Sequence, residues 1–352
     1  MRFGIWSNGL RDQSVAADIY DLDLEEIVAA DRLGYEEAWV SEHIGGPSNA
    51  VPNAELLIAK ASGLTARIRM GVAVRLLPLY NPIDVATGAA MLDHLLRGRY
   101  LFGFGSGIPF FKNMEQRGLT NDMRHAMQNE SIELILKCWT AAEPFAWNGK
   151  YWHGTSIRTL PRPYQTPYPP VAVATSQPSM LHTAGARGWT SMFGQFEGPE
   201  SIGNKVEMYL DGAGDAGRPA DRAKITVARH IHVTDDVRTA REELRSGVEP
   251  AIEFWKKFNP ERFVSYMPPS GDVADITYDS TFEHGLFIAG DPETVYQKLK
   301  DVYERAGGFG TLLVVMGKDW STSERRIRSL ERFMSEVAPR LADLGAAVAV
   351  SS

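Results

Sequence analysis

A carboxylate and an imidazole stand next to each other at the point where a short apolar segment of this sequence ends. Residues 36–43 read Glu-Glu-Ala-Trp-Val-Ser-Glu-His, so Glu42 and His43 follow a β-prone run. In a parallel α/β protein, side chains at the carboxyl end of a strand lie where ligands bind. We therefore predict Glu42 and His43 as catalytic residues, because an acid and a base at such a site can move protons. The structural alternative is that Glu42 caps a turn and His43 lies on a surface loop.

The elements that must position this pair alternate between strand-like and helix-like patterns along the chain. Eight apolar runs are typical of strands, and each is followed by a segment with helical periodicity. Eight consecutive units close into a (β/α)8 TIM barrel more readily than they stay open, and a doubly wound sheet is the alternative. The predicted strands are residues 3–6, 37–40, 68–74, 100–104, 171–174, 190–193, 225–233 and 311–315.

Two segments fall outside this alternation and are predicted as insertions between barrel units. Residues 144–170 are rich in proline and contain the turn Asn148-Gly149, which predicts a hairpin followed by an extended crossover. Residues 258–287 have a weak helical signal, and a loop of this length in a compact domain is usually a lid or a disordered segment. We predict a mobile lid there. No linker divides the chain, so residues 1–345 are predicted as one domain, followed by a short tail, 346–352.

The composition argues against several classes of protein. The net charge is −7 at pH 7, which disfavours nucleic-acid binding, and 44% hydrophobic residues are enough for a substantial core. No apolar run approaches the ~20 residues that a membrane-spanning helix needs. The chain enters its first predicted strand without a signal peptide. Cys138 is the only cysteine, so an internal disulfide is excluded and a cytoplasmic location is predicted.

Two further stretches have the composition of cofactor sites. Gly103, Gly105 and Gly107 lack the spacing of a dinucleotide fingerprint and are not followed at once by a helix. We expect instead a strand whose carboxyl end lets a planar ligand approach the backbone. Ser176 and Ser179 stand at the start of a predicted helix, whose free N–H groups and dipole favour an anion. Simple N-capping by these serines is the alternative.

Five motifs spread over the chain occur together in one known superfamily. They are Glu42-His43, the stretch 70–74 with Asn81-Pro82 downstream, the stretches 92–99 and 102–107 (Leu-Asp-His-Leu-Leu-Arg-Gly-Arg and Phe-Gly-Phe-Gly-Ser-Gly), the stretch 169–176 and the helix start 289–293. As a set they resemble the bacterial luciferase-like flavin monooxygenase superfamily over roughly residues 1–345. The resemblance implies a barrel with a flavin site at its mouth.

The resemblance also implies roles for individual residues. His43 matches the histidine that supports flavin–oxygen chemistry, and Ala73-Val74 matches a pair joined by a non-prolyl cis peptide against the flavin ring. Arg124 matches a phosphate-binding arginine, and Ser176 and Ser179 match the phosphate loop. The implied cofactor is FMN, which a separate flavin reductase would supply in reduced form because no nicotinamide site is visible.

Four positions depart from the pattern of the luciferase α subunit. Gly105 stands in place of a reactive cysteine, and Ser106 replaces a phosphate-contacting arginine. We keep Ser106 in the predicted cofactor site, where Arg124 would then supply most of the charge. Ile44 replaces a second histidine, and Thr175 replaces a glutamate. These changes argue against light emission from a fatty aldehyde and leave flavin-dependent oxygenation open.

Apolar side chains near the predicted strand ends are expected to form the substrate pocket. They would exclude water from a C4a-peroxyflavin, which survives only in a dry site. The predicted pocket residues are Trp6, Phe110, Met192 and Phe196. His230 and His232 share one face of a predicted strand, but no third ligand has suitable spacing, so no metal site is predicted.

Three functions remain open from the sequence. The leading one is a two-component, FMN-dependent monooxygenase that uses FMNH2 and O2 to oxygenate a small apolar aldehyde, ketone or terpene-like molecule, as a homodimer. The second is an F420-dependent oxidoreductase of the same superfamily, although such members often have Asp-His in place of Glu42-His43. The third is a non-catalytic flavin-binding partner subunit, which the presence of His43 and Arg124 argues against.

Overall fold

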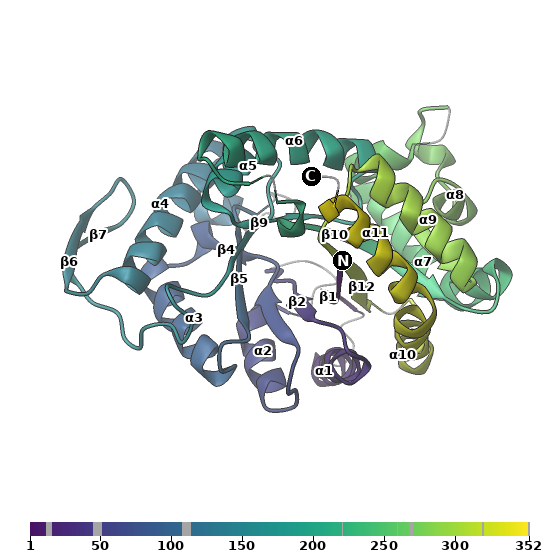
Figure 1. The fold of residues 1–352 in the computed structure, drawn as a ribbon, viewed down its shortest axis with the longest axis horizontal. Helices are drawn as coiled ribbons and strands as arrows, with labels where there is room; N and C mark the ends of the chain where they lie inside the picture. Colours follow the sequence, from purple (N-terminus) through teal and green to yellow (C-terminus); the bar gives the residue numbers. More distant parts are fainter. Residues whose placement is uncertain are drawn as a thin grey trace.

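Eight parallel strands close into a barrel in the computed structural model, which describes residues 1–11, 16–44, 51–107, 114–219, 221–258, 260–267, 270–318 and 320–350. The ring closes because β12 pairs with both β10 and β1 (Figure 1). All eight predicted strands are present, which confirms the (β/α)8 barrel. They are β1 (Arg2–Leu10), β2 (Glu37–Val40), β3 (Arg69–Val72), β5 (Tyr100–Gly105), β8 (Val171–Val173), β9 (Thr190–Phe193), β10 (Ile225–Val233) and β12 (Thr311–Lys318).

Helices surround the barrel on its outer side (Figure 1). The α-helices are α1 (Ala16–Leu33), α2 (Ala54–Ser62), α3 (Pro82–Leu95), α4 (Asn121–Thr140), α5 (Pro178–Arg187), α6 (Pro199–Asp215), α7 (Val237–Phe258), α8 (Tyr278–Glu283), α9 (Pro292–Arg305), α10 (Ser323–Arg332) and α11 (Ala338–Val350). A π-helical turn, Phe333–Val337, joins α10 to α11. Among the described residues, no helix has the length and apolar character that crossing a membrane requires.

The predicted hairpin within 144–170 is present as β6 (Phe145–Asn148) and β7 (His153–Ile157), which pair antiparallel beyond α4 (Figure 1). The carboxylate of Glu130 on α4 holds its turn, accepting the main-chain N–H groups of Lys150, Tyr151 and Trp152 at 3.0 Å. The hairpin is therefore fixed to the outside of the barrel.

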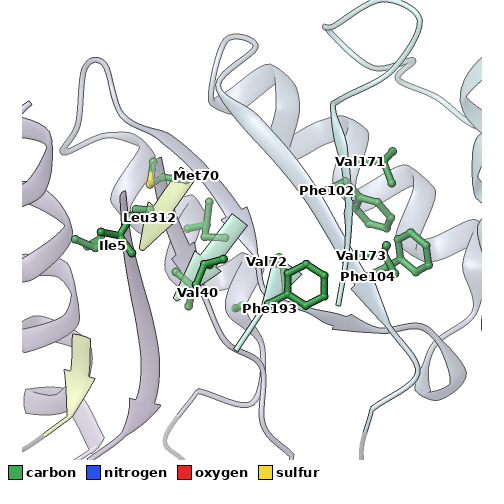
Figure 2. Packing of buried hydrophobic residues seen from close by; sticks show 14 of the residues in the cluster. Ile5, Val40, Met70, Val72, Phe102, Phe104, Val171, Val173, Phe193 and Leu312 are labelled. Atoms are coloured by element: carbon green, nitrogen blue, oxygen red, sulfur yellow. The ribbon is translucent and has the colours of Figure 1, made fainter. Parts of the chain in front are cut away.

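The main core lies between the barrel and its helices. Outward-facing strand residues such as Val72, Phe102, Phe104 and Val173 pack in this layer (Figure 2). Phe102 meets Trp139 of α4 edge-on, with ring centroids 5.1 Å apart. A separate cluster fills the barrel interior, formed by Trp39, Leu101, Ala172, Met192, Ala228, Leu313 and Val315. This alternation of faces is what period-two strand patterns predict.

The glycines of β5 are required by the protein's own packing. A Cβ atom at Gly103 would lie 2.0 Å from the carbonyl oxygen of Val72 on the neighbouring strand, and one at Gly105 would lie 2.7 Å from a methyl group of Val74. The expectation that these glycines make room for a planar ligand is therefore wrong for Gly103. The glycine allows β3 and β5 to approach closely.

We expect Gly103→Ala to lower the free energy of unfolding by about 1–3 kcal/mol or more, because the added methyl group meets backbone that cannot move aside. Gly88→Ala is the matched control: Gly88 lies on α3 with no atom near its would-be Cβ, so alanine there is expected to stabilise by about 1 kcal/mol. Urea unfolding of both variants measures the difference. Equal stability of the two variants would contradict the packing argument.

The segment 258–287, predicted as a loop with little regular structure, is in its described part folded and packed. It contains two 3₁₀ helices, η5 (Pro260–Tyr266) and η6 (Val273–Asp275), and the helix α8. Phe263, Tyr266, Tyr278 and Phe282 are buried in a second core cluster beneath α7. The sequence also missed the four-residue strand β11 (Phe287–Gly290), which pairs with β10. The predicted lid motion stays untested.

A buried ionic cluster joins the first and last parts of the chain. Arg11, at the end of β1, donates to Asp23 at 2.8 Å and lies 2.8 Å from Glu26, both on α1. Arg326 on α10 donates to Glu26 at 2.6 Å across 300 positions of sequence. The main-chain N–H of Gly317 donates to the second oxygen of Glu26. These contacts support the closure of the barrel between β1 and β12.

Candidate active site

A cavity of about 290 Å³ opens at the carboxyl ends of β1, β2, β3, β5 and β8. This is the end of a (β/α)8 barrel at which ligands bind. The structure brings eight residues predicted from the sequence to its wall: Trp6, Glu42, His43, Ala73, Val74, Ser106, Arg124 and Ser176. Residues from six separate parts of the chain therefore meet at one site.

Trp6 is held in place at one wall of the cavity. Its indole Nε1–H donates to the hydroxyl oxygen of Ser41 at 2.7 Å. Ser41 lies at the end of β2 and is itself buried. Ser41 is not among the residues predicted from the sequence, although its position directly before Glu42-His43 was a usable signal.

His43 and Glu42 follow β2, but their side chains have different surroundings. His43 is half-buried at the cavity wall, and its main-chain N–H donates to the carbonyl oxygen of Val51 at 3.0 Å. The side chain of Glu42 is 0% exposed and forms an ion pair with Arg75, with 2.5 Å between Nη1 and Oε2. Burial raises the pKa of the Glu42 carboxyl above its ordinary value, while Arg75 opposes this shift.

The peptide bond between Ala73 and Val74 is cis, as the resemblance implied. Both residues line the cavity, and the backbone continues into the short strand β4 (Arg75–Leu76), which pairs with the end of β5. Leu76 also reaches the cavity wall. Ala73, Val74 and Leu76 therefore form an apolar side of the site.

Arg124 supplies a positive charge to the cavity wall. It lies in the first turn of α4, where its guanidinium donates to Asn121 at 3.1 Å, to Ser106 at 2.9 Å and to the carbonyl oxygen of Gly107. Within the described part of the chain, no carboxylate forms an ion pair with it. Burial lowers its pKa below the ordinary value. An arginine remains protonated at neutral pH even so.

The start of α5 forms the adjoining wall. Ser176 and Gln177 line the cavity, and the helix begins at Pro178 with Gln177 as its N-cap. The Gln177 side chain makes no capping hydrogen bond, whereas Thr175 accepts the main-chain N–H of Gln177 at 3.1 Å. Ser176 and Ser179 therefore do not act as N-caps of α5, and the alternative of simple N-capping is wrong. Ser179 is exposed and is not among the described residues that line the cavity.

Two predicted pocket residues are not among the described residues that line the cavity. Met192 is buried inside the barrel, in the cluster against which Trp6 and Ala73 pack. Phe196 packs edge-on against Trp255 of α7, with centroids 4.9 Å apart, in the second core cluster. Neither belongs to the described cavity wall, because the direction of each side chain depends on packing that a strand-end position does not define. Phe110 lies outside the described residues.

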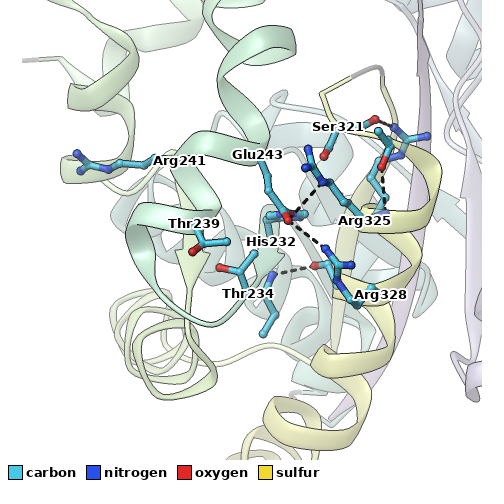
Figure 3. Close-up of polar contacts among 12 residues, drawn as sticks. His232, Thr234, Thr239, Arg241, Glu243, Ser321, Arg325 and Arg328 are labelled. Atoms are coloured by element: carbon cyan, nitrogen blue, oxygen red, sulfur yellow. Dashed lines mark hydrogen bonds and ion pairs between the residues drawn. The ribbon is translucent and has the colours of Figure 1, made fainter.

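His230 and His232 take separate structural roles. His230 stacks on Phe287, with centroids 4.9 Å apart. His232 pairs with Glu243 of α7 at 2.8 Å, and Glu243 also contacts Arg325 and Arg328 of α10 (Figure 3). Among the described residues, no group of three or more His, Cys, Asp or Glu side chains is placed to hold a metal ion.

The stability that Glu243 contributes through this network is expected to depend on pH. The hydrogen bond with His232, followed by the charges of His232 and the two arginines, lowers the pKa of Glu243 below its ordinary value. A carboxyl with a lowered folded-state pKa stabilises the fold above its unfolded-state pKa of about 4.3, and this is lost as the pH falls through the folded value. We expect Glu243→Gln to be less stable than the parent at pH 7 and nearly equal to it at pH 3. Urea unfolding at both pH values tests this, and an equal loss at both would contradict it.

Comparison with known proteins decides the family. The luciferase-like monooxygenase family matches residues 1–309. The chain belongs to this family. A relative, the 4-hydroxyprotoasukamycin monooxygenase of Streptomyces nodosus subsp. asukaensis, is 32% identical over 332 residues, which cover 91% of this chain and 86% of the relative.

Two further members of the luciferase-like family are similar over nearly the full length. The oxygenase component of the flavin-dependent trigonelline monooxygenase of Acinetobacter baylyi is 27% identical, covering 97% of this chain and 96% of the relative. A solved structure has a TM-score of 0.84 and 28% identity, covering 96% of this chain and 98% of the other. It is the oxygenating constituent of 3,6-diketocamphane monooxygenase from Pseudomonas putida, a type II Baeyer–Villiger monooxygenase in complex with FMN.

Several residues of the cavity carry no signal in the sequence that predicts them. Leu76, His125 and Gln177 line the cavity beside the predicted residues. His125 directly follows Arg124, and burial lowers its pKa below the ordinary value. Arg75 was missed as well, because nothing in the local pattern indicates that an arginine after a buried strand has carboxylate partners elsewhere in the chain.

Proposed function

We propose that this chain is the oxygenating component of a two-component, FMN-dependent monooxygenase. It would transfer one oxygen atom of O2 to a small apolar ketone, aldehyde or terpene-like molecule, and reduce the other to water with the two electrons of FMNH2. The observation that carries this proposal is the cavity that joins His43, the Ala73–Val74 peptide and Arg124 at the barrel mouth. The relatives named as flavin-dependent oxygenases support it.

The residues of the cavity fit FMN at both ends. Arg124 is a cation without a carboxylate partner among the described residues, and its neighbours are the hydroxyl of Ser106 and the start of α5 with Ser176. Such a set suits a phosphate dianion. The stretch from Ala73 to Leu76 offers an apolar face to a planar ring. When bound, reduced FMN supplies the electrons that activate O2.

The remaining side chains would control protons and water. His43 is the half-buried imidazole at the wall, placed to hydrogen-bond the reacting oxygen or to hold the proton that it needs. Trp6, fixed by Ser41, and Leu76 would exclude water from the same space. His43 is therefore the residue to which we assign the acid–base role.

Several features of the assembled enzyme belong to the same proposal. Reduced FMN would come from a separate reductase, in line with the relative that is named as an oxygenase component. We propose that residues 1–345 act as one catalytic domain with residues 346–352 as a tail, that the enzyme is a cytoplasmic homodimer, and that Ser179 contributes to phosphate binding. Light scattering on the purified chain measures the oligomeric state.

Product analysis tests the proposed function. The purified chain receives photoreduced FMN, O2 and a panel of cyclic ketones, aldehydes and terpenes, and ¹⁸O2 labels the product. We expect one ¹⁸O atom in the product of at least one substrate. Turnover with reduced F420 under anaerobic conditions would favour the oxidoreductase alternative. FMN binding without turnover on any substrate would favour a non-catalytic partner subunit.

A further inference from the structure

Arg75 lies between Val74 and Leu76, two residues that line the cavity. It follows the Ala73–Val74 cis peptide by one residue and begins β4. Its guanidinium pairs with Glu42 through Nη1, at 2.5 Å, and with Glu55 of α2 through Nη2, at 2.9 Å. One side chain thus joins the end of β3, the end of β2 and a helix.

A second layer of contacts fixes this arginine. The hydroxyl of Tyr100, on β5, donates to the other carboxylate oxygen of Glu55 at 2.8 Å. The centre of the guanidinium lies 4.0 Å from the centroid of the Tyr80 ring. A planar guanidinium can pair with two carboxylates and stack on an aromatic face at the same time, which a lysine cannot do. The arrangement therefore depends on arginine specifically.

Both members of the Arg75–Glu42 ion pair are buried. Arg75 is 6% exposed, and the Glu42 side chain is fully buried. A buried ion pair that loses one partner leaves an uncompensated charge, which is strongly destabilising. The backbone beside this ion pair carries His43, directly after Glu42, and the Ala73–Val74 peptide, directly before Arg75.

We propose that Arg75 is a positioning residue, and that its pairs with Glu42 and Glu55 hold His43 and the Ala73–Val74 peptide in fixed relation to each other. Glu42, predicted from the sequence as catalytic, acts through Arg75 because its carboxylate is fully buried and paired with that guanidinium. The pair aligns the imidazole with the face on which a flavin ring would lie. This inference rests on the proposed function of the same site.

The test is a double-mutant cycle with Arg75→Met, Glu42→Gln and the double variant, together with Arg75→Lys. Three properties are measured: the melting temperature, the visible circular dichroism of bound FMN, and the product formed per O2 consumed. We expect Arg75→Met to change the flavin dichroism and to lower the product formed per O2 consumed by about 10- to 100-fold, since small misplacements of reacting groups have effects of this size. The double variant should be no worse than Arg75→Met, because the stranded carboxylate is then absent.

Lys60→Met is the control. Lys60 lies on α2, the same helix as Glu55, and forms an exposed ion pair with Asp21 of α1. This substitution should leave all three properties unchanged. Additive losses in the cycle, or a lower melting temperature in Arg75→Met with unchanged dichroism and coupling, would overturn the proposal. If Arg75→Met does not fold, Arg75→Lys decides by the same readouts. A wild-type chain that neither binds FMN nor forms product would instead refute the proposed function.

Discussion

Replacement of His43 by alanine is expected to lower product formation by roughly 10²–10⁴-fold, the usual contribution of a positioned acid–base group. The side chain is half-buried at the cavity wall, while its main-chain N–H donates to Val51 and needs no imidazole. The variant should therefore fold normally and still bind FMN. Reduced flavin should then be consumed with release of H2O2 in place of product.

The measurements are product, H2O2 and O2 in single turnovers of the reduced complex, together with the melting temperature. His153→Ala is the matched control, since His153 is exposed on the β6–β7 hairpin, and it should behave as the wild type. A large fall in melting temperature for His43→Ala would indicate a structural histidine. Full coupling of O2 to product in that variant would remove His43 from the mechanism.

Arg124→Ala is expected to weaken FMN binding by about 1.5–3 kcal/mol, the range for a hydrogen bond to a charged group. Ser106 carries no charge, so Arg124 supplies the charge-assisted contact with the phosphate. The same substitution should have little effect on riboflavin, which lacks the phosphate. Fluorescence titration with both flavins separates the phosphate contact from general damage to the site.

Arg117→Ala is the control for this experiment. Arg117 is exposed in a 3₁₀ turn shortly before α4 and does not line the cavity. Its removal should change neither titration, although it lowers the net positive charge of the region equally. If the Arg124 variant and the parent bind FMN with the same preference over riboflavin, the phosphate lies elsewhere.

The barrel was predictable because its strands carry strong local signals. Thr190–Phe193 and Ile225–Val233 have the predicted bounds, since apolar residues at the barrel wall are buried on both faces and form continuous runs. The described part of 258–287 was not predictable in this way. Its side chains are ordered by contacts with Trp255 and Trp320, which lie outside the segment.

The residues of the site likewise differ in how far the local sequence predicts them. Glu42-His43 and Ala73-Val74 sit at strand ends, where position in the chain suffices to place them at the mouth. Arg75 acts through partners 20 and 33 positions away, and no local pattern encodes that pairing. Phe196 was assigned to the pocket from its apolar character and its position near a strand end, and the structure instead places it against the second core cluster.

The cluster of Arg11, Glu26 and Arg326 has a consequence for how this protein is made. The free edge of β1 obtains its partner only when residues 311–318 leave the ribosome. The roughly 300 residues between β1 and β12 take about 15–60 s to synthesise at about 5–20 residues per second. Throughout that time the nascent chain exposes an unpaired strand edge, together with the charges of α1 that are buried in the folded protein. A fragment that ends at residue 309 would lack β12 and never complete the ring, so such fragments should aggregate through this open strand edge.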